Sequence, residues 1–176
     1  LGIAAHSAAY TAVSVIGSMQ MQLTAGATPA QAGLLLSPVL LIVIIASALI
    51  GPALRRFGTR LVAGTGLLFS GAALAVPASL CSSAPLWAYG LALATWAVFG
   101  GGINHVALTR ETIGNAPPDQ RGAISGVFET ATHIGGALAL AVYAGALATG
   151  GFSVAYLWAI GFSITGAILV LLLIPR

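Results

Sequence analysis

Hydrophobic residues form six long runs along the chain, separated by short polar or proline-containing segments. The runs extend over about residues 1–23, 31–54, 61–81, 86–108, 122–148 and 153–174. Each has about 20 residues or more, and a helix of that length crosses a hydrocarbon core of about 30 Å. Lipid offers no partners to backbone polar groups, so a crossing segment must be helical. The pattern therefore predicts an all-α membrane protein with six transmembrane helices.

Local signals mark several helix boundaries. In the stretch TPAQ, Thr28 is suited to the N-cap, Pro29 to the first helical position and Gln31 to a capping box. Pro85 stands before the fourth run, and the prolines at 117 and 118 break the chain before the fifth. These residues predict where the second, fourth and fifth helices begin.

Composition excludes most soluble functions. The chain is 59% hydrophobic and 5% charged, against about half apolar and a quarter charged in soluble proteins. It contains no lysine, and its few arginines cannot form a nucleic-acid footprint. Its one cysteine, Cys81, cannot form an internal disulfide and is interpreted as a small packed residue.

The charges in the connections all fall on one side of the predicted membrane. They stand in the second and fourth connections and at the C-terminus: Arg55, Arg56, Arg60, Arg110, Glu111, Asp119, Arg121 and Arg176. By the positive-inside rule this side is cytoplasmic, which predicts a multi-pass protein of the cell membrane with both chain ends in the cytoplasm. An aromatic belt is predicted near the opposite side, formed by Trp87, Tyr89, Phe152, Tyr156 and Trp158.

Glycine is abundant, with 23 residues. Helices in lipid approach one another through small residues, so most of these glycines predict close helix packing. Gly122 and Gly126 form a GxxxG pair that we assign to this role.

Four ionisable residues stand inside the hydrophobic runs: His6, His105, Glu129 and His133. A charge near the bilayer centre costs at least about 2.5 to 3.5 kcal/mol, so such residues face a bundle interior or a wet cavity. We therefore expect the first, fourth and fifth helices to surround a polar space. A stripe with a spacing of four supports this in the first helix: His6, Tyr10, Ser14, Ser18 and Gln22. For Ser14 and Ser18, hydroxyls bonded to their own helix are the alternative.

Glu129 and His133 are four residues apart, so they share one face of the fifth helix and can pair. A buried carboxyl beside an imidazole can load and release protons near physiological pH. The alternative is a hydrogen-bonded pair that holds the helix against a neighbour.

Three segments carry a resemblance to a known family: MQLTAGATPAQAGLLLSPV, GPALRRFGTR and APPDQRGAISGVFETATHIGGALALAV. Together they resemble the C-terminal half of drug/proton antiporters of the major facilitator superfamily, in particular the fourteen-helix branch. The third segment is the most specific, and its matching positions are Gly122, Ser125, Gly126, Thr130, Gly135 and Gly136.

The chain departs from the family pattern at several positions. The second segment resembles the cytoplasmic loop motif at Gly51, Arg56, Gly58 and Arg60, but Arg55 occupies the usual acidic position, which argues against a latch through that residue. Glu129 and His133 stand where the family more often has Asn and Gln, and Thr132 where it often has Arg. A coupling role for this pair is therefore specific to this sequence.

The resemblance implies that residues 1–176 form one six-helix half of a transporter, built from two inverted three-helix repeats. The N-terminal half is absent from this chain and would be its partner. The first, second, fourth and fifth helices are expected to line a central cavity, and the third and sixth to face lipid. The implied activity is proton-coupled export of amphipathic or cationic small molecules, without a cofactor.

Two sets of residues are the candidates for this activity. The proton-coupling candidates are Glu129 and His133. The substrate-cavity candidates are His6, Tyr10, Ser14, Asn104 and His105.

Other classes of protein fit less well. An intramembrane protease would need a base beside Ser125, but His133 lies two turns along the same helix. No HExxH or cysteine-histidine spacing predicts a metal site, so we expect no enzyme activity. A non-transporting six-helix remnant or scaffold remains the alternative. The chain begins with Leu1 inside an apolar run, without an initiator methionine or signal peptide, and is interpreted as a fragment.

Overall fold

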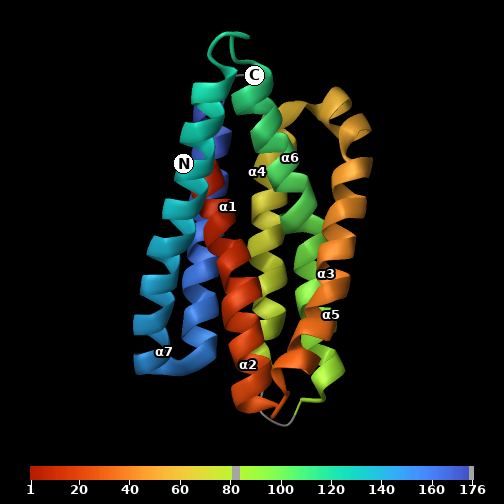
Figure 1. Ribbon diagram of the computed structural model, residues 1–176, viewed down its shortest axis with the longest axis vertical. Coiled ribbons are helices and arrows are strands. Elements are labelled where there is room, and N and C mark those ends of the chain that lie inside the picture. Colours follow the sequence, from red (N-terminus) through yellow and green to blue (C-terminus); the bar gives the residue numbers. More distant parts are fainter. Residues whose placement is uncertain (81–83, 175–176) are drawn as a thin grey trace.

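The computed structural model of the chain is a bundle of helices that run roughly side by side, and it describes residues 1–80 and 84–174 (Figure 1). Within these ranges every regular element is helical, which confirms the predicted all-helical fold. The predictions for Cys81 and Arg176 concern residues outside the described ranges. In chain order, with π-helical turns written as η, the elements are α1 (Gly2–Thr11), η1 (Ala12–Ile16), α2 (Gly17–Thr24), α3 (Pro29–Leu49), α4 (Gly51–Ser79), α5 (Leu86–Trp96), η2 (Ala97–Gly101), α6 (Gly102–Thr109), η3 (Arg110–Gly114) and α7 (Arg121–Leu173).

The predicted helix starts agree with the structure. Thr28 is the N-cap of α3, Pro29 follows it, and the side chains and backbones of Thr28 and Gln31 form a complete capping box. Pro85 is the N-cap residue of α5. These signals act within a few residues, so the sequence is sufficient to place them.

Two helices change direction at a glycine. The backbone of Gly58 in α4 has φ 75° and ψ 162°, and that of Gly151 in α7 has φ 72° and ψ −164°. Residues with a Cβ almost never adopt this region. Gly58 separates a short segment, residues 51–57, from the long part of α4. Gly151 divides α7 into a first arm (residues 121–150) and a second arm (residues 152–173), which run in opposite directions beside each other (Figure 1).

Four helical runs in the described ranges are long and apolar enough to cross a membrane: Pro29–Leu49, Gly51–Ser79, Leu86–Gly114 and Arg121–Leu173. The run from Gly2 to Thr24 is not among them, because its polar stripe lowers its hydropathy. Two predicted boundaries were wrong. The second run ends at Leu49, since residues 51–57 already belong to α4. The fourth continues to Gly114, so Arg110 and Glu111 lie in the helical turn η3 and not in a loop.

Large aromatic side chains fill the middle of the bundle. Trp96, Tyr89, Tyr143 and Tyr156 are each at most 1% exposed. The hydroxyl of Tyr143 donates a hydrogen bond of 2.8 Å to the carbonyl oxygen of Ala8 and so joins α7 to α1. The predicted aromatic belt was therefore wrong for Tyr89 and Tyr156, because their faces of α5 and α7 point into the bundle. Trp87 and Trp158, in contrast, are exposed.

Helices approach most closely where glycine replaces a side chain. A Cβ on Gly135 of α7 would lie 2.6 Å from the Cα of Ala4 in α1. A Cβ on Gly102 of α6 would collide with the carbonyl oxygen of Val43 in α3. Gly122 and Gly126 have no such neighbour within 4 Å among the described residues, so the packing role of this pair stays a prediction. Their face of the first arm is open.

The bend at Gly151 yields a testable prediction. Gly151→Ala is expected to lower the free energy of unfolding by about 1 to 3 kcal/mol, because alanine cannot adopt this backbone conformation without strain. A Cβ there meets nothing within 4 Å, so the cost arises from the backbone alone. Gly145→Ala is the matched control: it also has open space but lies inside the helix, where alanine is the better helix former. Denaturant unfolding of the two variants in detergent tests this, and equal stabilities would contradict it.

Candidate functional site

Polar side chains from α1, α3, α6 and the first arm of α7 line one hollow in the bundle. This central cavity has a volume of about 260 Å³. Its lining comes from α1, α3, η2, α6 and the first arm of α7: His6, Ser7, Tyr10, Val43, Ser47, Gly101, His105 and Thr132. The cavity thus lies between the helices for which the sequence predicts a polar space.

Aromatic rings form a continuous set of contacts along one side of the central cavity. The ring of His6 is stacked on Trp96, with centroids 6.3 Å apart and 15° between the planes. His6 also lies 5.9 Å from the ring of His105, and Tyr10 lies 6.0 Å from that of Trp96. His105 meets Phe128 edge to face at 6.0 Å. These contacts connect α1, α5, α6 and α7 and fix the positions of the two imidazoles.

One imidazole nitrogen in the cavity wall has no hydrogen-bond partner. His6 is 5% exposed, and its Nδ1 is buried without a partner among the described residues. A buried polar group left unpaired costs about 1 to 3 kcal/mol. His6 lines the central cavity together with the hydroxyl side chains of Ser7, Tyr10, Ser47 and Thr132, so the cavity offers several polar groups to an occupant.

Two of the three π-helical turns in the described residues stand close in sequence to residues that line the cavity. The turn η1 begins two residues after Tyr10, and η2 begins directly after Trp96 and ends with the lining residue Gly101. A π-helical turn rotates the side chains that follow it relative to those before, and such turns are frequent at functional sites.

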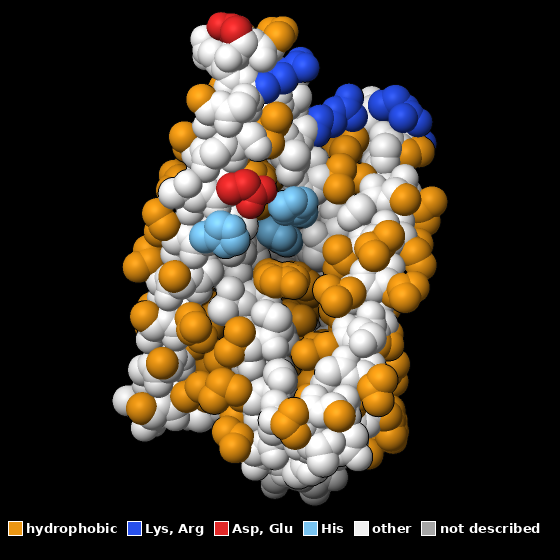
Figure 2. Space-filling view, in the orientation of Figure 1, with side chains coloured by type: hydrophobic (Ala, Val, Ile, Leu, Met, Phe, Trp, Pro, Cys, Tyr) orange, Lys and Arg blue, Asp and Glu red, His pale blue; other side chains and the backbone are white. Residues whose placement is uncertain are grey.

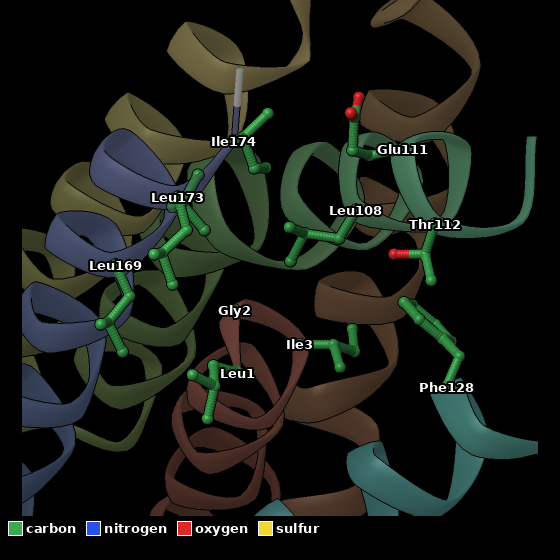
Figure 3. A pocket seen from close by; sticks show the side chains of 11 residues that line it. Leu1, Gly2, Ile3, Leu108, Glu111, Thr112, Phe128, Leu169, Leu173 and Ile174 are labelled. Atoms are coloured by element: carbon green, nitrogen blue, oxygen red, sulfur yellow. The ribbon is translucent and has the colours of Figure 1, made fainter. Parts of the chain in front are cut away.

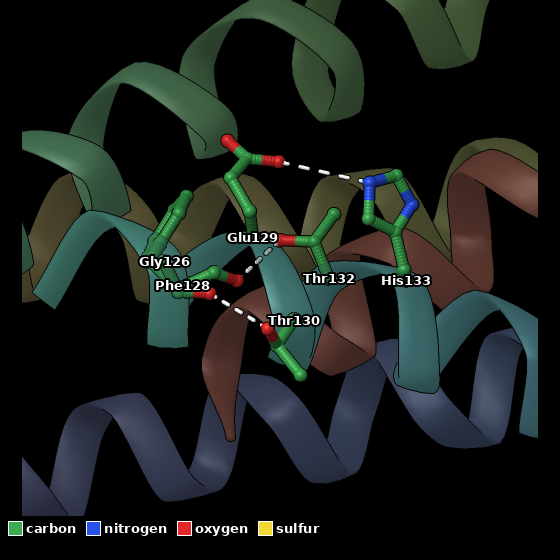
Figure 4. A network of polar contacts seen from close by, with 6 residues as sticks. All are labelled: Gly126, Phe128, Glu129, Thr130, Thr132 and His133. Carbon is green, nitrogen blue, oxygen red and sulfur yellow. Dashed lines mark hydrogen bonds and ion pairs between the residues drawn. The ribbon is translucent and has the colours of Figure 1, made fainter. Parts of the chain in front are cut away.

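Glu129 and His133 form a pair on the open face of the first arm. Oε2 of Glu129 lies 4.0 Å from Nε2 of His133, and the side chains are 55% and 83% exposed, respectively (Figure 4). The hydroxyl of Thr132, which lines the cavity, donates to the carbonyl oxygen of Phe128 at 2.9 Å. The predicted pairing is present, but the predicted burial is not, because this face of α7 is exposed in the chain.

The ionisable side chains inside the bundle occupy one face. In the space-filling view, histidine side chains and an acidic side chain gather about halfway along the molecule (Figure 2). The arginines visible in this view lie at one end of the bundle, which we call the arginine end. A patch of titratable groups at mid-depth is thus separated along the helices from the charges of the connections.

Two other cavity candidates lie elsewhere. The hydroxyl of Ser14 donates to the carbonyl oxygen of Tyr10 at 2.9 Å, the alternative considered for it from the sequence. Asn104 is fully buried, and its amide faces Gly66 of α4, away from the lining residues. Neither residue lines the central cavity.

Sequence reasoning missed other cavity residues: Ser7, Val43, Ser47, Gly101 and Thr132. Two of them, Ser47 and Thr132, are hydroxyl residues bonded to their own helix, at Val43 and Phe128. A hydroxyl in an apolar run usually forms this bond, so it carries no signal of a cavity.

The residues of the predicted loop motif stand at the arginine end. Gly51 begins α4, Gly58 forms its bend, and Arg60 starts the long segment. The guanidinium carbon of Arg56 lies 5.2 Å from the centroid of the Phe57 ring, a cation–π contact. The motif thus forms the corner through which the chain leaves one long helix and enters the next.

A second hollow lies near the start of α1 and is less suited to polar chemistry. Its volume is about 230 Å³ and its walls are mainly aliphatic or aromatic, as Leu1, Ile3, Leu108, Phe128 and Leu169 illustrate (Figure 3). Glu111 and Thr112 supply the side-chain oxygens drawn at its edge. The central cavity, with two imidazoles and several hydroxyls, is the stronger candidate site. Among the described residues no group of three or more acidic, histidine or cysteine side chains could hold a metal ion.

Long apolar helices around a cavity that several polar side chains line are typical of a multi-pass membrane protein. The sequence model of the Major Facilitator Superfamily matches residues 1–176, the full length of the chain. The chain therefore belongs to this superfamily of membrane transporters. A comparison with curated proteins found no significant match.

The positions of Tyr10 and Asn104 predict different reactivities. In a Cys81→Ser background, Tyr10→Cys is expected to react with a water-soluble cationic thiol reagent at least about tenfold faster than Asn104→Cys, because reaction requires an accessible thiolate. Tyr10 is 42% exposed at the cavity, whereas Asn104 is 0% exposed. Labelling followed by mass spectrometry gives the two rates. Equal rates would show that Asn104 also faces water.

Proposed function

We propose that the chain is the C-terminal six-helix half of a secondary active transporter that exports amphipathic or cationic small molecules in exchange for protons. The observation that carries this proposal is the central cavity of about 260 Å³, which is lined by two imidazoles and four hydroxyl side chains. Membership of the superfamily supports transport. The motif resemblance to fourteen-helix drug antiporters supports the more specific assignment.

The proposed half has six membrane spans arranged as two inverted triplets. The first span is residues 2–24, and the bend at Gly151 makes the two arms of α7 separate spans. The others are α3, the long part of α4, and the run from α5 to η3. Inverted repeats of this kind place substrate sites near the membrane midplane. The arginine end is assigned to the cytoplasm by the positive-inside rule, in the cell membrane.

An N-terminal half that lies outside this chain would cover the open face. That face holds the exposed side chains of Glu129 and His133 and the mouth of the central cavity. Covering it would withdraw the pair from bulk water and enclose the cavity between two halves. The polar residues about halfway along the helices are then exposed because the other half does not cover them here.

In the proposed mechanism Glu129 and His133 handle the proton. Protonation of the Glu129 carboxylate removes its charge and so weakens the pair with His133 four residues away. The pair is on the same arm as Thr132, which lines the cavity. A change in the pair can therefore alter the wall against which substrate binds.

The substrate would bind in the central cavity. His6, Tyr10 and His105 present rings, while Ser7, Ser47 and Thr132 present hydroxyl groups. A mainly apolar pocket with few polar groups is typical of small-molecule sites. Ser14 and Asn104 are left out of the proposed site because they lie off the cavity.

Substitution of the pair tests the proton assignment. Glu129→Gln and His133→Ala in the complete transporter should each reduce efflux driven by an imposed pH gradient at least about tenfold, which corresponds to a barrier higher by about 1.4 kcal/mol. Proteoliposomes loaded with a fluorescent cation provide the measurement.

Asp119→Asn is the matched control, because it removes an exposed carboxylate from the turn before α7. It should leave efflux unchanged. Unaltered pH-dependent efflux in both Glu129→Gln and His133→Ala would exclude the pair as proton carriers. Absence of any transport by the complete protein would instead favour a scaffold.

A further inference from the structure

A separate hollow lies at the arginine end, outside the central cavity. This arginine groove has a volume of about 710 Å³. It lies between the bend of α4, the turn η3 and the end of α7, and is lined by Phe57, Gly58, Thr59, Arg60, Leu61, Glu111, Leu171 and Ile174. The activity proposed above does not use these residues as binding groups.

The lining of the arginine groove is amphipathic. Leu61, Leu171 and Ile174 provide aliphatic surface from two helices, and Leu61 is 51% exposed. Arg60 and Thr59 provide polar groups at the start of the long segment of α4. In a membrane protein such a groove, at the end of long apolar helices, meets the boundary between acyl chains and headgroups.

Positive charge exceeds negative charge at the groove. Arg60 lines it, and Arg56 lies over the ring of Phe57, which also lines it. The bend at Gly58 separates these two arginines along α4: Arg60 lines the groove itself, whereas Arg56 adjoins it through its contact with the Phe57 ring. Glu111 is the acidic side chain among the lining residues. Charge complementarity therefore favours an anionic occupant.

We propose that the arginine groove binds one anionic phospholipid of the surrounding membrane. The phosphate contacts the guanidinium groups of Arg60 and Arg56, which suit phosphate oxygens through paired N–H donors. An acyl chain lies on Leu61, Leu171 and Ile174. The carboxylate of Glu111 repels the negatively charged headgroup and so lowers the affinity of the groove for the lipid. The lipid joins the corner of α4 to the end of α7 and does not depend on the transport mechanism.

Native mass spectrometry tests the site in protein purified from vesicles of equal parts phosphatidylglycerol, phosphatidylethanolamine and phosphatidylcholine. Wild-type protein is expected to retain phosphatidylglycerol preferentially. Arg60→Gln should reduce this retention about fivefold, the effect of one arginine near an anionic surface. Arg60→Lys should restore part of it, and Glu111→Gln should increase it above wild type.

Arg110→Gln is the matched control, because it removes the same charge from an exposed position next to Glu111 that does not line the groove. It should leave retention unchanged. Equal losses for Arg60→Gln and Arg110→Gln would overturn the proposal in favour of general surface attraction. Equal retention of the zwitterionic lipids would overturn the proposal that the groove prefers an anionic lipid. Displacement of the lipid by millimolar inorganic phosphate would also overturn it, because the groove would then be a site for the phosphate group alone. If Arg60→Gln fails to fold, unchanged retention in Glu111→Gln overturns the proposal by itself.

Discussion

Polar groups are stable inside lipid only where protein or water provides hydrogen-bond partners, and this constraint accounts for most of the architecture. It requires the backbone to be helical through each apolar run. It also explains how deep polar side chains are used as ties between helices. Gln20 donates from Nε2 to the carbonyl oxygen of Pro77 at 3.2 Å, and Tyr143 donates to Ala8. His6 differs from them, because its Nδ1 is buried without a hydrogen-bond partner among the described residues.

Close contacts between helix backbones lie beside the central cavity and fix the positions of the helices that line it. Gly102 meets the backbone of α3 at Val43, and the adjacent Gly101 lines the cavity together with that same valine. Gly135 meets Ala4 in α1, two and three residues before the lining residues His6 and Ser7. Small residues thus let α6 and α7 approach their neighbours, while the rings of His6, Tyr10 and His105 occupy the space beside those contacts.

Polar chemistry in this protein occurs at two depths. About halfway along the bundle, imidazoles, hydroxyl groups and the Glu129 carboxyl surround the central cavity and one open face, where the energetic cost of a charge is highest. At the arginine end, permanent charges border an amphipathic groove, where headgroups and water solvate them. The helical run from α6 to η3 contributes to both sites, because His105 lines the central cavity and Glu111 lines the groove. A change of tilt in this run therefore affects both.

The sequence by itself determined the helical class, the capping box at Thr28, the start of α5 after Pro85 and the pairing of Glu129 with His133, because these depend on residues within about four positions of one another. Only the tertiary structure decided which side of each helix is buried. His105 reaches the cavity while its neighbour Asn104 is sealed against α4, and Tyr10 lines the cavity while Ser14, one turn later, does not. The spacing of four is the same for both members of the stripe, so it cannot distinguish them. The difference arises from which neighbouring helix each position meets, and from the π-helical turn between Tyr10 and the rest of the first run, both of which depend on contacts far apart in the chain.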